Sequence, residues 1–326
     1  MSFVHLHTHS HYSLLDGLSK VPQLVAKAKE YGMSAIALTD HGAMYGVVEF
    51  YQKCTKAGIK PIIGVEAYVA PNGRLNKRPR IDEVRYHLVL LVKNATGYQN
   101  LLKLTSRAHL EGFYYKPRID WELLEEYHEG LIALSACVQG EIPQSILAGD
   151  AAKTEELIKR FQRVFGPDNF YLELQHHPTM PEQTIVNAAL KEWGKKLNVA
   201  LVATADTHYI EPADAEAQDV LLCLQMKKLK SDPNRLCLLD IDASFKSPEQ
   251  MAADFADVPA AVTNTVRIAE QCNFELKLGE IKLPTFAVPA SQTADEYLAD
   301  LCQQGLPRRY GDTPTQVVLE RLTYEL

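Results

Sequence analysis

Short apolar runs alternate with amphipathic stretches over the first two thirds of the chain. The apolar runs have the length and β-branched content of buried strands, and the stretches between them repeat with the period of a helix. Seven strands are predicted, at Phe3–Leu6, Ala35–Leu38, Ile62–Val69, His87–Val92, Leu131–Leu134, Phe170–Leu174 and Ala200–Ala203. The helices expected between them cover Val21–Tyr31, Met44–Ala57, Gly97–His109, Ala151–Phe165 and Glu182–Leu197.

This alternation predicts an α/β fold with a mainly parallel sheet. Seven strand candidates indicate a barrel at least as strongly as an open sheet.

The pattern becomes mostly helical after Thr207. Helices are expected at Ala213–Leu224, Pro248–Ala256 and Val258–Cys272, followed by a proline-bearing segment, Leu283–Ser291. The stretch Ala294–Leu326 predicts two helices around Gly305-Leu306-Pro307. The last residues lack a capping glycine or asparagine, so we expect a chain that has been cut within a helix.

Composition narrows the class of protein. With 46% hydrophobic residues and 23% charged residues, the 326-residue chain can bury a substantial core. Its six cysteines lack CxxC spacing, which favours reduced thiols and a cytoplasmic protein. We expect no signal peptide, because polar histidines take the place of its apolar core, and no membrane span, which needs about 20 apolar residues.

The net charge of −7 argues mildly against a nucleic-acid partner, although charge can be local. Two basic clusters stand out, and solvated loops are an equally good interpretation of both. One cluster consists of Arg74, Lys77, Arg78, Arg80 and Arg85, and the other of Lys227, Lys228, Lys230 and Arg235.

Metal-binding residue types gather where the predicted strands end. The active sites of α/β barrels form at the carboxyl ends of the strands, where distant parts of the sequence meet. Imidazole and thiolate suit zinc, and carboxylates suit zinc or manganese and can bridge two ions. The candidates are His7, His9, Asp16, Asp40, His41, Glu66, His87, Cys137, Asp206 and His208.

Each of these residues has an ordinary interpretation when taken alone. His87 and Cys137 can be core residues, Asp16-Gly17 can be a turn, and Asp40 can cap a helix. His5 and His11 are either supporting groups or mere neighbours of the ligands. The joint pattern carries the prediction: His7 and His9 share one side of an extended chain, and Asp206 and His208 repeat that spacing.

Several motifs resemble the PHP (polymerase and histidinol phosphatase) superfamily, and most closely the PHP domains that open bacterial replicative DNA polymerase III alpha subunits. They are Leu6-His7-Thr8-His9, Thr39-Asp40-His41-Gly42, Asp206-Thr207-His208, Gly112–Asp120, Leu134–Cys137 and Tyr171–Gln175. The resemblance implies a distorted seven-stranded β/α barrel over residues 1–282, with a mostly helical extension. Residues 283–326 would be a linker and the truncated start of the polymerase palm region.

The same resemblance implies nine ligands for three divalent ions, zinc and/or manganese, with iron and magnesium as alternatives. His7, His9, Glu66 and Asp206 would hold one ion. Glu66 would bridge to a second ion, held with His87 and Cys137. The third ion would lie with Asp16, His41 and His208. His5, His11 and Asp40 are expected to support these ligands, while Ala205 departs from the asparagine usual in the family.

Three functions remain open. The first is a 3′→5′ proofreading exonuclease that acts on the primer terminus through a metal-activated water, with no side-chain nucleophile. In that case the cluster Arg74–Arg85, in a βα-type insertion, would contact DNA phosphates. The second is a phosphomonoesterase of the histidinol-phosphatase kind. The third is a metal-stabilised scaffold that docks a proofreading exonuclease subunit and other replisome subunits. The parent chain would be a DNA-directed DNA polymerase, whose palm carboxylates lie beyond Leu326.

Overall fold

The computed structural model describes residues 2–281 and 283–326. Its contacts divide the chain into two compact units, Met1–Leu276 and Lys277–Leu326. The predicted domain boundary at residue 282 lies outside the described residues, and the structural division comes six residues before it.

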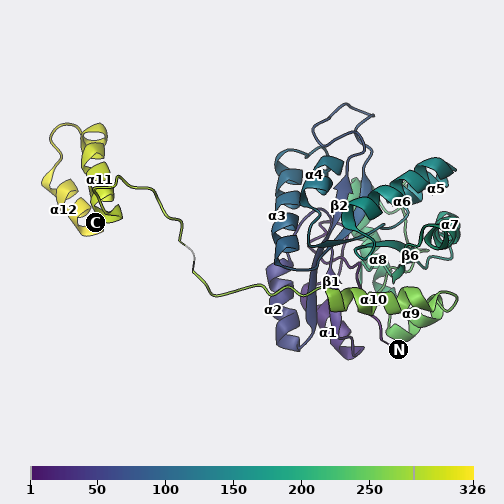
Figure 1. Cartoon of the computed structure of the whole chain (residues 1–326). Helices are drawn as coiled ribbons and strands as arrows, with labels where there is room; N and C mark the ends of the chain where they lie inside the picture. The colour runs from purple at the N-terminus through teal and green to yellow at the C-terminus, as the bar shows by residue number, and fades with distance from the viewer. Residues whose placement is uncertain (1, 282) are drawn as a thin grey trace. The chain divides into compact units, whose positions relative to one another are not determined.

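The first unit is built around one curved sheet (Figure 1). Its strand order is β1-β2-β3-β5-β6-β7, with β4 paired to β2. All pairings are parallel except those of β3, which runs antiparallel to both β2 and β5. The strands are β1 Ala35–Leu38, β2 Lys60–Val69, β3 Tyr86–Val92, β4 Arg118–Ile119, β5 Leu131–Leu134, β6 Phe170–Gln175 and β7 Leu201–Thr204.

The N-terminal segment joins the two edges of this sheet. On the β1 side, the amide of Ala37 donates to the His5 carbonyl at 2.8 Å. On the β7 side, the amide of His9 donates to the Thr207 carbonyl at 2.8 Å. The predicted strand Phe3–Leu6 is therefore wrong as a regular strand, because the chain bends at His7 and its bonds to the two edges are scattered. The predicted distorted barrel is confirmed.

Alternating side chains divide the apolar core into two layers. Ile36 and Leu38 of β1 belong to the larger cluster, which packs the sheet against the surrounding helices. Ala35 and Ala37 belong to the smaller cluster inside the barrel. Helix α10, Pro259–Gln271, contributes Ile268 to this inner cluster. It closes the end of the barrel where the parallel strands begin.

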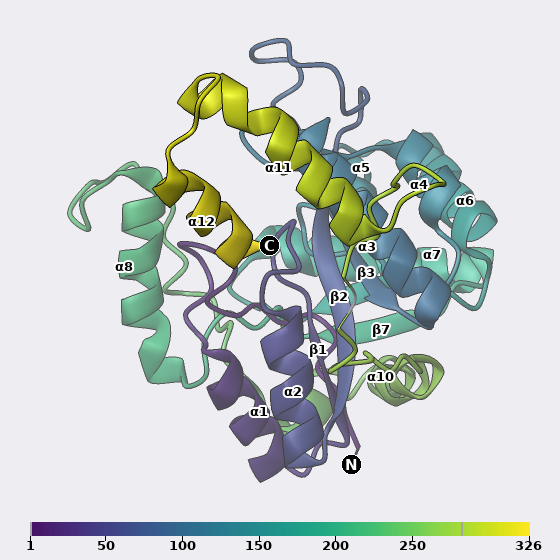
Figure 2. The same ribbon diagram turned by 90° about the vertical axis from the view of Figure 1, so that its left-hand side faces the viewer.

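Most helices lie within a few residues of their predicted positions. Figure 2 shows α1 and α2 side by side near β1 and β2. Two short helices of seven residues each, α4 and α5, were not predicted, since their periodicity is weak. The remaining bounds are α1 Val21–Glu30, α2 Val47–Ala57, α3 Ala95–Leu110, α4 Trp121–Tyr127, α5 Glu141–Leu147, α6 Ala151–Phe165, α7 Pro181–Leu197, α8 Ala215–Met226 and α9 Pro248–Asp254.

The second unit contains α11, Ala294–Tyr310, and α12, Gln316–Glu325. The predicted break at Gly305-Leu306-Pro307 is wrong, because α11 continues through it. Pro307 lacks only one donor near the helix end, and the helix stops instead at Gly311, whose φ of 77° suits glycine. The predicted helical extension is confirmed. None of the helices in the described chain is long and apolar enough to cross a bilayer.

Candidate metal centre

The nine predicted ligands meet at one end of the barrel, away from the end that α10 closes. Strands β1, β5 and β7 end here, and His41, Cys137 and Asp206 follow them. His87 stands near the start of its strand, yet it lies at the same end because β3 runs antiparallel to its neighbours. The antiparallel strand thus explains how a residue at the opening of a strand joins a site built from strand ends.

Glu66 of β2 is the centre of this group. Its Oε1 lies 3.3 Å from His7 Nε2 and 2.8 Å from His87 Nδ1. Its Oε2 lies 3.6 Å from His9 Nε2 and 2.6 Å from His41 Nδ1. One buried carboxylate therefore contacts four imidazoles, an arrangement suited to bridging metal ions.

The first subsite contains His7, His9, Glu66 and Asp206. Asp206 Oδ1 lies 3.2 Å from His7 Nε2 and 3.3 Å from His9 Nε2. Ligand atoms of His7, His9 and Glu66 lie within 4.8 Å of one another, close enough to share an ion.

The second subsite joins Glu66 to His87 and Cys137. The Cys137 Sγ lies 3.7 Å from His87 Nδ1, and ligand atoms of all three residues are within 4.8 Å of one another. A thiolate, an imidazole and a carboxylate form a donor set that suits zinc.

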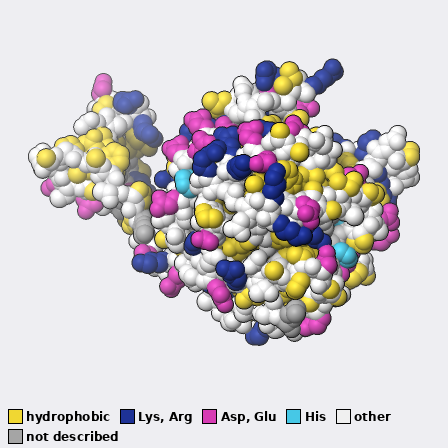
Figure 3. Space-filling model, turned by 45° about the vertical axis from the view of Figure 1, so that its right-hand side comes forward, with side chains coloured by type: hydrophobic (Ala, Val, Ile, Leu, Met, Phe, Trp, Pro, Cys, Tyr) yellow, Lys and Arg dark blue, Asp and Glu magenta, His cyan; other side chains and the backbone are white. Residues whose placement is uncertain are grey.

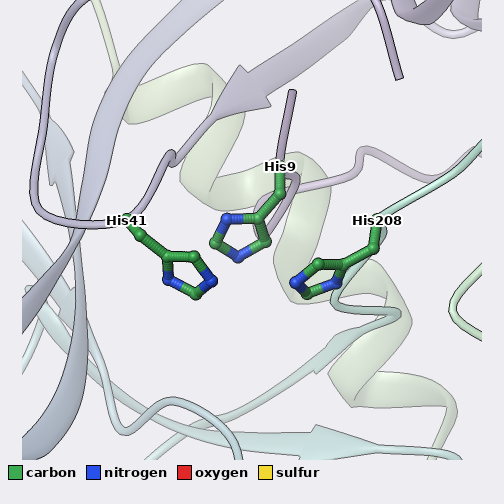
Figure 4. A group of neighbouring side chains, drawn as sticks. All are labelled: His9, His41 and His208. Carbon is green, nitrogen blue, oxygen red and sulfur yellow. The ribbon is translucent and has the colours of Figure 1, made fainter. Parts of the chain in front are cut away.

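The third subsite is formed by Asp16, His41 and His208. Asp16 lies 3.0 Å from His41 Nε2 and 3.9 Å from His208 Nε2, measured from its two carboxylate oxygens. Figure 4 shows the rings of His9, His41 and His208 turned toward one another. His9 therefore lies between the first and third subsites, although the resemblance had assigned it to the first alone.

Five buried atoms of these side chains form no hydrogen bond. They are His7 Nε2, His9 Nε2, His41 Nδ1, Glu66 Oε2 and Asp206 Oδ1. The contact between His41 Nδ1 and Glu66 Oε2 is short but lacks hydrogen-bond orientation. Leaving buried polar atoms unpaired costs about 1–3 kcal/mol each. Converging, unpaired nitrogen and oxygen donors fit divalent cations.

The charges of the cluster shift the pKa values of its members strongly. Burial opposes protonation of His41, yet Glu66 and Asp16 raise its pKa to about 10. Burial and the neighbouring His41 and His208 lower the pKa of His9 to about 3. Burial and the charge of Glu66 raise the pKa of the Cys137 thiol. Metal binding at this cluster must therefore displace protons.

Glu173 supports His7 and was missed as a site residue. His7 Nδ1 donates to Glu173 Oε1 at 2.7 Å, which fixes the tautomer and leaves Nε2 as a free ligand atom. The carboxylate is also bonded by Thr204 and Gln175. The sequence does contain a signal that could have identified Glu173, because it is a charged residue inside the buried strand Phe170–Gln175.

Ser13 and Asp40 orient His9 in the same way. The Ser13 hydroxyl donates to Asp40 Oδ1 at 2.7 Å and so accepts from His9 Nδ1 at 2.9 Å. The His9 Nε2 lone pair then faces the other ligands. Asp40 accepts from Ser10 and Ser13 and does not cap α2, which begins after Gly46. Ser13 was missed because a lone serine just after the histidine run carries no distinctive pattern.

The other two supporting candidates lie differently. His5 is bonded through Nε2 to the Lys246 carbonyl at 2.9 Å and packs on Phe245, so it acts in the core below the ligands. The ring of His11 packs against Tyr12, and its buried Nδ1 forms no hydrogen bond.

Three of the seven non-glycine residues with positive φ in the described chain lie at the ligand-bearing turns. Leu15, Ala136 and Asp206 have φ values of 61°, 62° and 49°, in the left-handed region that non-glycine residues seldom adopt. The first two directly precede Asp16 and Cys137. Such strain persists where the surrounding structure holds it, and it clusters at functional sites.

The first basic cluster is largely structural. Arg74 is buried and paired with Asp120, Glu111 and Glu122, and Arg78 pairs with Asp82. These residues lie in the connection between β2 and β3, so the predicted βα-type insertion is wrong. The prediction failed because β3 runs antiparallel to β2, so this loop joins two neighbouring antiparallel strands. Lys77 and Arg80 are exposed on this loop.

Arg85 differs from the rest of that cluster because it lines a cleft of about 330 Å³ whose lining includes seven of the nine candidate ligands, all except His7 and His9. Lys116, which was missed, lines the same cleft, and both cations lie over the Tyr68 ring. Neither forms an ion pair with a carboxylate among the residues that the structure describes. In the second basic cluster, Arg235 is paired with buried Asp219.

A family model described as PHP domain matches residues 5–177, just over half of the chain. The chain belongs to the PHP domain family. The DNA polymerase III subunit alpha of Borreliella burgdorferi is 48% identical, over 99% of this chain and 28% of that protein. Those of Treponema pallidum and Thermus aquaticus are 45% and 44% identical, over 100% and 97% of this chain and 28% and 27% of those proteins.

This PHP chain thus spans little more than a quarter of the length of these relatives. The solved structure of a two-domain protein from Bacteroides vulgatus, described as containing a predicted PHP-like metal-dependent phosphoesterase, has 15% identity and a TM-score of 0.40. The matched region covers 83% of this chain and 69% of that one.

Proposed function

We propose that this PHP domain is a metal-dependent 3′→5′ exonuclease that hydrolyses the terminal phosphodiester of a DNA primer. The observation that carries the proposal is the contact of one buried carboxylate, Glu66, with four imidazoles at the floor of an open cleft. The unpaired donors support a site for divalent ions. The proposed number of three, and the identity as zinc and/or manganese with iron and magnesium as alternatives, follow the family resemblance.

The protein's own residues would have distinct tasks in this reaction. Glu66 and the histidines hold the ions, and Glu173 and Ser13 fix the His7 and His9 tautomers that make this possible. Bound divalent ions supply a nucleophile by lowering the pKa of water from about 15.7 to about 7. No side-chain nucleophile is then required. Arg85 and Lys116 line the same cleft and would contact the phosphate backbone.

The DNA surface would be small and local. Figure 3 shows Lys and Arg side chains interspersed with Asp and Glu on one face of the molecule. This mixture, with the net charge of −7, favours recognition of a primer end inside the cleft over binding along an extended basic face.

A primer-degradation assay tests this function. The purified chain should release nucleotides from the 3′ end of a 5′-labelled primer, lose this activity in EDTA, and regain it with zinc or manganese. The double variant Asp206→Ala/His208→Ala should be inactive. A matched control, Asp168→Ala/His128→Ala, removes the same residue types outside the cleft and should keep full activity. Undiminished activity of the Asp206→Ala/His208→Ala variant would sink the assignment.

The unpaired buried donors also favour a second function, that of a metal-stabilised scaffold. In this proposal the ions stabilise the fold and its surface docks a proofreading subunit or other replisome subunits. A large fall in melting temperature on chelation, without any nuclease activity in the metal-loaded chain, would favour it over the exonuclease.

The relatives are named DNA polymerase III subunit alpha, which supports a polymerase as the parent protein, and we propose that it acts in the cytoplasm. We propose that the whole protein is a DNA-directed DNA polymerase, while residues 1–326 alone do not incorporate nucleotides. Template-dependent primer extension by the 326-residue chain would contradict this.

A further inference from the structure

One part of the cleft wall contains no predicted metal ligand and no charged side chain. It combines residues around the start of α7 with residues of the loop after α8. We call it the neutral wall, and its members are His177, Met180, Gln183, Leu236, Leu238 and Ile241.

The two segments of the neutral wall are tied together and to the metal centre. The Thr179 hydroxyl donates to the Asp240 carbonyl at 2.6 Å, which joins the turn before α7 to the loop after α8. The Tyr209 hydroxyl donates to the Ile241 carbonyl at 3.1 Å, and the amide of His208 donates to the Ala243 carbonyl at 2.9 Å. The wall is therefore held beside a candidate ligand, His208.

Two buried polar atoms of this wall form no hydrogen bond. They are Gln183 Oε1 and His177 Nδ1, in side chains of residues only 2% and 7% exposed. The Gln183 amide is oriented by its Nε2, which donates to Asn187 Oδ1 at 2.9 Å, so its acceptor oxygen is left over. Neither atom belongs to the nine candidate ligands. A group that pairs with them would recover the cost of their burial.

The geometry points to the neutral wall as the subsite for the heterocyclic base of the terminal nucleotide. Gln183 Oε1 accepts a hydrogen bond from a base N–H, His177 Nδ1 bonds a second polar atom of the base edge, and Leu238 and Ile241 contact its flat face. This inference rests on the proposed exonuclease function and names where its substrate lies.

The chemistry of the wall favours a base over a phosphate. The phosphodiester of DNA offers only acceptors, and the Gln183 oxygen would repel it. The cations of the cleft, Arg85 and Lys116, belong to the other part of its lining. Every DNA base has an N–H donor and an apolar face, so one acceptor beside leucine and isoleucine can accommodate all four bases.

Equilibrium binding to the full zinc-loaded chain tests the subsite, with thymidine 5′-monophosphate and inorganic phosphate as probes. The wild type should bind the nucleotide about tenfold more tightly than phosphate, the effect of one or two added contacts. Gln183→Ala should remove most of that difference and leave phosphate binding unchanged. Ile241→Ala, in the half-buried loop, provides a second variant that does not depend on the buried glutamine. Gln99→Ala, exposed on α3, is the matched control.

Equal affinity of the wild type for the two probes would overturn the inference, as would an unchanged affinity ratio in both wall variants. The binding ratio does not depend on turnover. If the chain degrades primers but binds both probes equally, only the proposed base subsite is contradicted. If it prefers the nucleotide but never degrades a primer, only the proposed exonuclease function is contradicted.

Discussion

At the scale of single residues, the centre depends on which imidazole nitrogens carry protons. Glu173 accepts from His7 Nδ1 and so presents Nε2 to the first subsite. We predict that Glu173→Gln lowers metal affinity about 10–100-fold, the usual cost of losing a supporting partner, while the fold persists. Competition with a chelator measures this. Glu155→Gln, on the surface of α6, should keep wild-type affinity; equal affinities in both variants would show that Glu173 does not orient His7.

At the scale of elements, Arg118 of β4 holds the long connection between β2 and β3. Its buried guanidinium donates to the carbonyls of Gly112, Asp82, Arg74 and Asn76. Arg118→Met leaves these acceptors unpaired, so we predict a loss of about 3 kcal/mol or more in the free energy of unfolding and earlier proteolysis within residues 70–86. Urea unfolding and limited proteolysis measure the two effects.

The matched control for this element is Arg80→Met, an exposed arginine on the same loop. It should change the free energy of unfolding by less than about 0.5 kcal/mol. Equal stability of the two variants would mean that Arg118 does not hold the loop.

At the scale of the whole molecule, the metal centre joins segments from residue 7 to residue 208. Without ions, their unpaired donors remain buried against one another. We predict that chelation lowers the melting temperature, and that a divalent ion at 100 times its dissociation constant restores about 2.7 kcal/mol per site. Thermal unfolding at increasing zinc concentration measures this. A melting temperature independent of zinc would contradict the prediction.

The sequence predicts the alternating elements well because buried strands and amphipathic helices have strong local periods. The sequence predicts the structure less well where contacts between distant segments determine it. No local pattern encodes three features of the fold. These are the direction of β3, the closure of the sheet by residues 3–9 and the continuation of α11 through Pro307.

The candidate site shows the same division. All nine ligand candidates were identified from two sequence signals, their placement at strand ends and the resemblance of their motifs to a known family. The support from Glu173 and Ser13, the buried ion pairs of Arg74 and the unpaired Gln183 depend on side-chain geometry between distant segments. Glu173 alone had a local signal, as a carboxylate inside an apolar strand.

The central claim is that Glu66 organises a centre of three metal ions. Elemental analysis of the purified, metal-loaded chain beside its Glu66→Gln variant tests it most directly. We predict about three divalent ions per wild-type chain, the number implied by the resemblance to the PHP superfamily, and a clear loss of bound metal in Glu66→Gln. Metal content near background in the wild type, or equal content in the two proteins, would contradict the claim.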